Sequence, residues 1–445
     1  MTTSDTIYAL SSGPGRAGVA VIRVSGSRSA ALAEAIAGAL PQPREFALRS
    51  LRDAKSGELL DRGVVIWLPA PRSFTGEDCA EFHLHGSLGV VSAFLQMLSL
   101  QPGVRPAEPG EFTRRAFAGG KMDLVEIEGL ADLLEARTMS QRRQALQQMS
   151  GRATSIFNKW RQELLLIRAD IEAVVDFVEE PGVAAAAAPG IDARLNRLQA
   201  EISESIVRSA SSEVIRDGVR VVLAGHPNTG KSSLLNVLAR REAAIVSDVP
   251  GTTRDVIEVT LEVTGIPVVL TDTAGIRVQV ADEVEKEGIR RTRERIGEAD
   301  VVIWVSSPDI PGSEEPDPFS IADVRVRNKA DLGEPSDVER SSQGDLISVS
   351  TKTGAGVGEL LAALEGLLKA RYGHAESALI VSNRQKLATM RVNEHLINAL
   401  TLGHDALELK AEEVRRASDE IGRLTGRVDV EEWLGAIFSR FCIGK

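Results

Sequence analysis

The sequence predicts a multidomain α/β plus α protein, with an N-terminal α+β domain and a helical domain into which an α/β domain is inserted. Three observations support this prediction. The chain has 445 residues, more than a single hydrophobic core usually organises. Apolar residues recur at strand spacing in some segments and at helical spacing in others. Helical patterns also flank the α/β segment on both sides, as expected of an inserted domain.

The first predicted domain covers residues 1–118. It mixes short strand patterns with two helix patterns, which is typical of an α+β arrangement. We expect strands at residues 6–10, 18–25, 63–68 and 79–84, and helices near residues 28–40 and 87–100.

The predicted helical domain combines residues 119–215 with residues 376–445. Apolar residues recur there at helical spacing, as in Leu124, Ile127, Ala131 and Leu134. Residues 179–190 (EEPGVAAAAAPG) are of low complexity and contain two Pro-Gly pairs, so we expect a loop. The chain ends in a short amphipathic segment around Ile437, Phe438 and Phe441.

The predicted inserted domain covers residues 216–375. Continuous apolar runs separated by helix patterns predict a parallel sheet covered on both faces. The expected strands are residues 219–224, 268–270, 301–305, 324–326 and 346–349.

The composition excludes several classes of protein. A net charge of −11 argues against a broad basic face for nucleic acid, so any RNA contact needs a local patch or a partner. Two cysteines provide neither a disulfide framework nor a thiolate metal site. No run approaches the ~18 apolar residues of a membrane span. We therefore expect a soluble, cytoplasmic protein.

Residues 225–232 (GHPNTGKS) carry the strongest chemical signal. They match the G-x-x-x-x-G-K-[ST] pattern between a predicted strand and a predicted helix. Glycines let backbone N–H groups surround phosphate oxygens, Lys231 reaches the β and γ phosphates, and the Ser232 hydroxyl binds Mg²⁺. The predicted nucleotide contacts in this segment are Asn228, Thr229, Gly230, Lys231, Ser232 and Ser233.

Four further motifs follow in the order that a Ras-like P-loop G domain requires, at residues 252–255, 272–275, 328–331 and 350–352. Thr253 in residues 252–255 (TTRD) offers a hydroxyl to Mg²⁺, and Asp272 in residues 272–275 (DTAG) places a carboxylate beside the metal. Asp331 in residues 328–331 (NKAD) accepts the N1 and N2 hydrogens of guanine, which adenine lacks. Each motif alone also fits a turn or a helix cap, but their joint order predicts GTP binding. The remaining predicted contacts are Ser247, Asp248, Val249, Pro250, Gly251, Thr252, Thr273, Ala274, Gly275, Asn328, Lys329, Ser350, Thr351 and Lys352.

The position that orients the hydrolytic water in Ras-like proteins carries no polar side chain in this sequence, so another residue must orient the water. Ras-like proteins have a Gln directly after the Asp-x-x-Gly motif, and this chain has Ile276 there. Asp282, Glu283 and Glu285 are the nearest carboxylates. Acidic residues also stabilise a helix N-terminus, so the residues alone leave both roles open.

These motifs resemble those of the MnmE (TrmE) family of tRNA-modification GTPases, and the resemblance spans nearly the whole chain. Within the G domain it rests on Asn228 and on residues 244–255, 272–277 and 282–285. Outside it, the matching segments are residues 14–26, 73–78, 109–113 and 441–445. The outer segments distinguish this family from ribosome-assembly GTPases that share the P-loop asparagine.

The resemblance implies a potassium ion and a catalytic acid. K⁺ would be bound by Asn228, Ser247, Val249 and Thr252, and would replace an arginine finger. Ser247 stands where the family pattern has Thr, which keeps a hydroxyl. Glu285 would act on the attacking water, and the other predicted catalytic residues are Arg254, Asp255 and Arg277.

The N-terminal domain resembles folate-binding modules. By this resemblance Arg23, Glu81, Lys121 and Lys445 contact a tetrahydrofolate derivative, either the 5,10-methylene or the 5-formyl form. Strand alternation places Arg23 with Val19 and Val21, and a charge on such a face needs a partner. Without the family resemblance, ordinary surface or interface ion pairs would be the favoured explanation for any one of these residues. Cys442 is assigned no chemistry.

The family implies a homodimer that works with a flavin-dependent partner, MnmG. Together they would add a carboxymethylaminomethyl or aminomethyl group to carbon 5 of the wobble uridine of certain tRNAs. FAD and NADH would belong to the partner, because this chain has no G-x-G-x-x-G after a strand. Two alternatives remain, a ribosome-assembly or translational GTPase and a GTP-regulated folate-dependent aminomethyltransferase.

Overall fold

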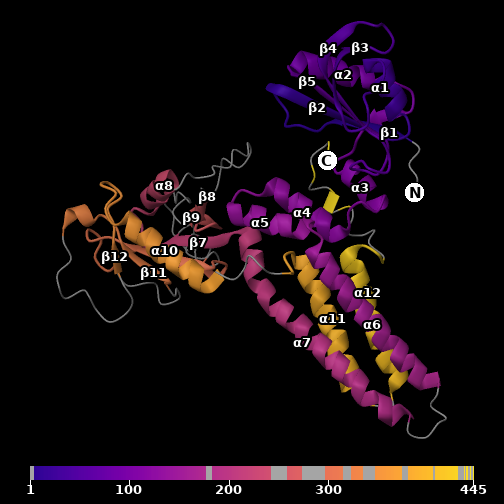
Figure 1. Cartoon of the computed structure of the whole chain (residues 1–445). Coiled ribbons are helices and arrows are strands. Elements are labelled where there is room, and N and C mark those ends of the chain that lie inside the picture. The colour runs from indigo at the N-terminus through magenta and orange to yellow at the C-terminus, as the bar shows by residue number, and fades with distance from the viewer. Residues whose placement is uncertain are drawn as a thin grey trace, which may run out of the picture. The chain divides into compact units, whose positions relative to one another are not determined.

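The computed structural model describes most of the chain (Figure 1). The described residues are 5–176, 183–241, 258–272, 296–313, 322–333, 346–372, 379–403, 406–428, 435, 437, 438, 441 and 444. They fall into two compact units. The first contains Met1–Ala131, Gln148–Ala173 and Ala411–Lys445, and the second contains Asp132–Gln147 and Val174–Lys410.

A six-stranded sheet forms the centre of the first unit, in the order β3-β4-β5-β2-β1-β6. All neighbours are antiparallel except β1 and β6, which are parallel. The strands are β1 (Thr6–Leu10), β2 (Ala17–Ser25), β3 (Phe46–Arg52), β4 (Leu59–Leu68), β5 (Cys79–Gly86) and β6 (Val104–Pro106). The four predicted strands are confirmed, whereas β3 and β6 were not predicted.

Two helices cover one face of this sheet, α1 (Ser29–Ala37) and α2 (Leu88–Ser99) (Figure 1). Their apolar side chains share a core with alternate residues of the strands, including Ile22, Val24 and Phe82. Burial follows the pleat, because side chains alternate between the two faces of a strand. Arg23 and Val21 therefore share the face away from this core. The alternation predicted that they share a face, and the structure shows which face it is.

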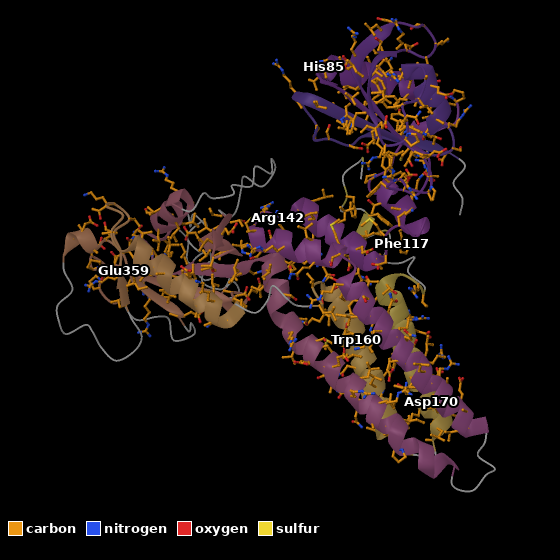
Figure 2. The ribbon with its side chains drawn as sticks, in the orientation of Figure 1. His85, Phe117, Arg142, Trp160, Asp170 and Glu359 are labelled. Atoms are coloured by element: carbon orange, nitrogen blue, oxygen red, sulfur yellow. The ribbon has the colours of Figure 1, made fainter. Side chains whose placement is uncertain are left out.

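Seven further helices of the described residues complete the helical part of the chain. Trp160 lies on α6 (Figure 2). It is only 1% exposed and belongs to a buried row at helical spacing with Phe157, Leu164 and Ile167. Helices α7 and α11 are joined by a hydrogen bond from Gln199 Nε2 to Asn393 Oδ1 at 3.0 Å. The helices are α3 (Glu111–Ala118), α4 (Leu124–Glu135), α5 (Met139–Met149), α6 (Arg152–Asp176), α7 (Val183–Asp217), α11 (Asn383–Thr401) and α12 (Leu407–Thr425).

The predicted loop at residues 179–190 is wrong for residues 183–190, which open helix α7. Five of these residues are alanine, the best helix former. Pro189 lies inside the helix, so the alanine run is helical in spite of a residue that disfavours helix interiors.

The second unit contains another six-stranded sheet, in the order β12-β11-β10-β7-β9-β8. Helices α8 (Lys231–Arg241) and α10 (Val357–Tyr372) share its larger core, while Ala224, Val302 and Trp304 form a small cluster of their own. The strands are β7 (Val219–Ala224), β8 (Glu258–Val263), β9 (Ile266–Asp272), β10 (Val301–Ser306), β11 (Val324–Arg327) and β12 (Leu346–Ser348).

The prediction of a purely parallel sheet needs correction, because β8 pairs antiparallel with β9. Thr264 and Gly265 join the two strands with φ angles of 53° and 85°. Two consecutive positive φ angles are typical of a tight hairpin turn. The alternation of Val259, Leu261 and Val263 with polar residues was the available sequence signal. All other pairs in this sheet are parallel.

Candidate functional site

The loop between β7 and α8 forms the base of the candidate site. Gly225 has a φ of 144°, and a Cβ atom there would lie 2.1 Å from the Val305 carbonyl oxygen. Gly230 has a φ of 89°, and its Cβ would lie 2.2 Å from Asn328 Nδ2. Only glycine tolerates both the backbone conformation and the close approach. Asn228 also has a positive φ, 65°, and is exposed at this loop.

Lys231 begins α8 and turns its amino group back over the loop. Its Nζ donates hydrogen bonds to the carbonyl oxygens of Gly225 at 2.9 Å and His226 at 2.8 Å. Burial lowers the pKa of Lys231, and the Asp272 carboxylate opposes that shift. The ammonium is therefore held among backbone oxygens at the mouth of the loop.

Ser232 and Asp272 join the loop to the end of β9. The Ser232 hydroxyl donates a hydrogen bond to Asp272 Oδ2, and Asp272 is only 2% exposed. These residues place a hydroxyl and a carboxylate side by side, and hard oxygen donors of this kind suit Mg²⁺. Ser233 follows on the exposed side of the helix.

Asn328 holds three loops together and is fully buried. Its Nδ2 donates to the Thr229 carbonyl oxygen at 2.9 Å, and its Oδ1 accepts from the Thr351 backbone N–H at 3.3 Å. An amide suits this position because it donates on one side and accepts on the other. The structure thus brings the phosphate-type loop, residues 328–331 and residues 350–352 to one end of the sheet.

Asp331 and Ser350 lie in two of these loops. The Ser350 hydroxyl donates to Asp331 Oδ1 at 2.7 Å, and this hydrogen bond holds the pKa of Asp331 below its usual value. The carboxylate is therefore ionised near neutral pH and accepts hydrogen bonds only. Lys352 is exposed nearby, and Lys329 pairs with Asp309 at 2.7 Å.

Many predicted site residues lie outside the described part of the chain. They are Ser247, Asp248, Val249, Pro250, Gly251, Thr252, Thr253, Arg254, Asp255, Thr273, Ala274, Gly275, Ile276, Arg277, Asp282, Glu283, Glu285, Cys442 and Lys445.

A second polar cluster occupies the face of the N-terminal sheet that α1 and α2 do not cover. Arg23 and Glu81 are cross-strand partners, with Arg23 Nε and Nη2 each 2.8 Å from Glu81 Oε1. The Arg23 guanidinium lies 5.1 Å from the Phe74 ring centroid and 5.7 Å from that of Phe112. Arg23 Nη1 and His83 Nε2 are buried without a hydrogen-bond partner. The expected partner for Arg23 is thus present, and the cluster retains unused donors.

Lys121 and the chain terminus belong to the same compact unit. The Lys121 side chain packs over Gly76, where a Cβ atom would lie 3.1 Å from its Cε. The Ser11 hydroxyl donates to the Gly444 carbonyl oxygen at 3.0 Å. Because Ser11 follows β1 and Ala9 of β1 is opposite Arg23, the end of the chain lies against this sheet.

Sequence reasoning assigned no role to Phe74 and Phe112, the two rings beside Arg23. Both lie within short glycine-containing segments, residues 73–78 and 109–113. A glycine-rich segment carrying one aromatic residue was the available signal. The Asn328 bridge was also missed, because only the tertiary fold brings residues about 100 positions apart into contact.

No helix among the described residues has both the length and the apolarity needed to cross a bilayer.

Comparison with known proteins adds family evidence across the chain. The family model described as the GTP-binding protein TrmE N-terminus matches residues 6–121, and the MnmE helical domain model matches residues 124–442. A tRNA modification GTPase MnmE of Rhizobium meliloti (strain 1021) is 46% identical over 100% of both chains. The protein of the same name from Rhodopseudomonas palustris is 45% identical over 100% of this chain and 99% of its own.

A further MnmE, from Brucella canis, is 46% identical over 99% of this chain and 98% of its own. Full-length identity of this size, together with the loops at residues 225–232, 328–331 and 350–352 that meet at one end of the sheet, decides the family assignment. The chain belongs to the MnmE family of tRNA modification GTPases.

Proposed function

We propose that this GTPase is stimulated by K⁺ and works with an MnmG partner. Together they would add a carboxymethylaminomethyl or aminomethyl group to carbon 5 of the wobble uridine of certain tRNAs. The observation that carries the nucleotide part is the Asn328 bridge, which holds Thr229 and Thr351 in one site. The family membership carries the tRNA part.

The base of GTP would be read by Asp331, with a backbone amide of residues 350–352 at the guanine O6. Only guanine among the common purines supplies two adjacent hydrogens to a carboxylate. The Ser232 hydroxyl and the Asp272 carboxylate would serve the Mg²⁺ ion, with Thr253 as a further ligand. Bound Mg²⁺ would neutralise charge that develops on the phosphates.

K⁺ binding would use Asn228, whose exposed position and positive φ place it at the surface of the loop. Ser247, Val249 and Thr252 would supply the remaining oxygens. A monovalent cation at this position would stabilise the charge that an arginine finger stabilises in other GTPases. Arg254, Asp255 and Arg277 complete the proposed catalytic set.

Glu285 is proposed to orient the attacking water, because Ile276 offers no polar group. Glu285→Ala should slow single-turnover hydrolysis by about 10²- to 10⁴-fold in saturating K⁺, while nucleotide affinity stays nearly constant. Glu283→Ala is the matched control. A rate within a few-fold of the parent for Glu285→Ala, or greater damage in Glu283→Ala, would assign the role to another carboxylate.

The N-terminal cluster is proposed to bind 5,10-methylene- or 5-formyl-tetrahydrofolate. Arg23 Nη1 is a buried donor without a hydrogen-bond partner, and His83 Nε2 is buried without one and lies 3.7 Å from Glu81 Oε2. Two aromatic rings lie beside the guanidinium. Such a set fits a flat, polar heterocycle, because rings stack and unused polar atoms give orientation. Arg23, Glu81, Lys121 and Lys445 would make the contacts.

The remaining parts of the proposal are the assembly and its location. The chain would form a homodimer, and its complex with MnmG would be a heterotetramer or larger. MnmG would bring FAD and NADH, and glycine or ammonium would supply the rest of the added group. The complex would work in the cytoplasm.

Nucleoside analysis of tRNA from cells lacking this gene tests the proposal. We expect loss of the wobble-uridine modification, restored by the parent chain and not by Arg23→Ala. Intact modification together with a ribosome-assembly defect would contradict the proposal and favour the assembly GTPase.

A further inference from the structure

A basic stretch without any acidic residue covers residues 136–162 of an otherwise acidic chain. The full chain carries a net charge of −11, yet these residues contain no Asp or Glu. Amide and hydroxyl side chains occupy most of the other polar positions. The cations are Arg137, Arg142, Arg143, Arg152, Lys159 and Arg161.

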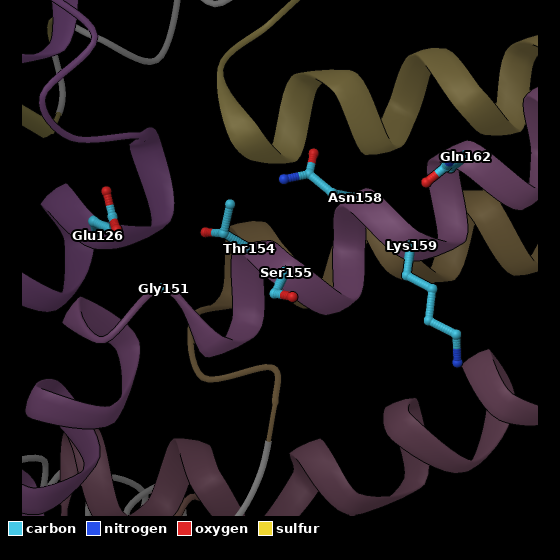
Figure 3. A pocket seen from close by; sticks show the side chains of 7 residues that line it. All are labelled: Glu126, Gly151, Thr154, Ser155, Asn158, Lys159 and Gln162. Atoms are coloured by element: carbon cyan, nitrogen blue, oxygen red, sulfur yellow. The ribbon is translucent and has the colours of Figure 1, made fainter.

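A polar groove lies along the C-terminal part of this stretch, entirely within the first compact unit. Its volume is about 650 Å³. Figure 3 shows its α6 residues along the first turns of that helix, with Glu126 on α4 facing the start of α6. The lining residues are Glu126, Gly151, Thr154, Ser155, Asn158, Lys159 and Gln162.

The chemistry of the groove is strongly polar. Ser155, Lys159 and Gln162 are exposed, and Arg152 is exposed in the first turn of the same helix. Thr154 Oγ1 and Asn158 Oδ1 are buried without hydrogen-bond partners, so two of the lining residues have unused hydrogen-bonding capacity. Glu126 is the one acidic side chain among the described residues that line the groove.

One oxygen of Glu126 is already engaged. Glu126 Oε2 accepts the Asp123 backbone N–H at 2.9 Å. Burial raises the pKa of Glu126, with a smaller contribution from the Asp123 charge. The Asp123 N–H therefore already occupies one of the two carboxylate oxygens that would face an anion near the start of α6.

We propose that this groove binds the sugar-phosphate backbone of tRNA. Arg152 and Lys159 would neutralise phosphates, while Ser155 and Gln162 would donate to phosphate oxygens or engage ribose 2′-hydroxyl groups. The inference rests on the proposed function for the identity of the RNA.

The composition of the groove favours RNA backbone over the other classes of partner. The described residues that line the groove include no aromatic or large apolar side chain. They therefore offer neither a stacking platform for bases nor the apolar anchor of a typical protein interface. Because the chain as a whole is acidic, phosphate binding requires a local patch of this kind.

The test measures binding of an unmodified tRNA transcript to the full-length protein by fluorescence anisotropy at several KCl concentrations. Arg152→Gln/Lys159→Gln should weaken binding by about tenfold at low salt. It should also lower the slope of log K against log salt by about 1.4, at roughly 0.7 for each lost phosphate contact. Ser155→Glu, which puts a carboxylate into the groove, should weaken binding without changing GTP hydrolysis.

The matched control is Arg168→Gln/Arg208→Gln, which removes the same charge from helix positions outside the acid-free stretch. It should leave the slope within about 0.3 of the parent value, well below the change expected for two lost contacts. Equal affinity and slope in the control, the groove double variant and the parent would overturn the inference.

Two further outcomes would also overturn the inference that this groove binds tRNA. Groove variants that lose tRNA modification in cells while binding tRNA normally would assign the groove to a protein partner. A parent chain that binds no tRNA at low salt would exclude direct docking. Neither result touches the proposed function, which fails only if cells lacking the gene keep the wobble modification.

Discussion

Asp331 carries the base specificity at the scale of a single residue. Its carboxylate is ionised, because the Ser350 hydroxyl donates to it at 2.7 Å and lowers its pKa. An ionised carboxylate has acceptors only, so a base with two adjacent donors is its natural partner.

Asp331→Asn should therefore weaken GTP binding by about 10²-fold or more and shift preference toward xanthosine triphosphate, whose C2 carbonyl suits an amide donor. Titration with fluorescent nucleotide analogues gives both affinities. Asp323→Asn, which alters a carboxylate paired with Arg371, should leave GTP affinity unchanged. Unaltered GTP affinity in Asp331→Asn would remove this residue from the site.

Glu111 shows a residue-scale contribution to stability that depends on pH. Its side chain is 1% exposed and pairs with Arg105 at 2.6 Å and Arg115 at 3.1 Å. Burial raises the pKa of Glu111, but the hydrogen bond from Arg105 and further partners outweigh it, so the net shift is downward. A lowered pKa contributes stability that is present above the ordinary value of 4.5 and is lost as the pH falls through the lowered value.

Glu111→Gln should destabilise the region of β1 and α3 at neutral pH by about 3 kcal/mol, because two guanidinium groups lose a buried partner. The difference from the parent should shrink as the pH falls below 4.5. Hydrogen exchange of β1 and α3 amides in the full chain measures this destabilisation at each pH. Glu108→Gln removes an exposed pair with Arg114 and should change little. A difference that grows toward acid pH would contradict this assignment.

At the scale of elements, the end of α7 is hydrogen-bonded to α5 and to Ile380, two segments of its unit that are distant in sequence. The Ser212 hydroxyl, fully buried, donates to the Ile380 carbonyl oxygen at 2.6 Å. The Gln144 side chain on α5 donates to the Ser212 carbonyl oxygen at 3.2 Å. Because α7 leads into β7, these contacts fix the position at which the chain enters the six-stranded sheet of the second unit.

Ser212→Ala should destabilise this junction by about 1 to 2 kcal/mol, since it leaves a buried carbonyl without its side-chain donor. Reduced amide protection in the last turns of α7 and in residues 379–382 would show the effect. Ser205→Ala on the same helix removes only a local bond to the Glu201 carbonyl and should stay within about 0.5 kcal/mol. Equal effects of the two substitutions would show that the junction depends on other contacts.

At the scale of the whole molecule, the proposed potassium site predicts a salt-specific activity. GTP turnover and pairing of the G domains should fall when Na⁺ replaces K⁺ at matched ionic strength, because a smaller ion fits the proposed oxygen cage poorly. Steady-state hydrolysis and light scattering measure the two effects. Asn228→Ala should abolish the difference between the salts, and equal parent rates in K⁺ and Na⁺ would refute the site.

Local signals in the sequence determined a large part of this molecule. The P-loop with its strand and helix and the strands of residues 219–224 and 301–305 agree with the structure. These features depend on contiguous residues, because glycine positions and apolar runs encode them directly. The same is true of Arg23, because alternation along its strand predicted that it shares a face with Val21.

Weakly patterned segments were decided by their surroundings. Strands β3, β6 and β8 are short or carry charges, and they become strands by pairing with neighbours. Residues 183–190 contain loop-type Pro-Gly pairs, but the alanine run continues into α7. A sequence pattern describes each segment separately, whereas in the folded chain the contacts with neighbouring segments also determine its secondary structure.

The sequence by itself determined the G-domain motifs, the N-terminal α+β pattern and the family resemblance. Only the tertiary structure decided that Asn328 joins Thr229 to Thr351, that Phe74 and Phe112 lie beside Arg23, and that Gly444 contacts Ser11. The physical reason is that such contacts join residues tens to hundreds of positions apart. Their formation depends on the packing of whole elements, which no local pattern of residues encodes.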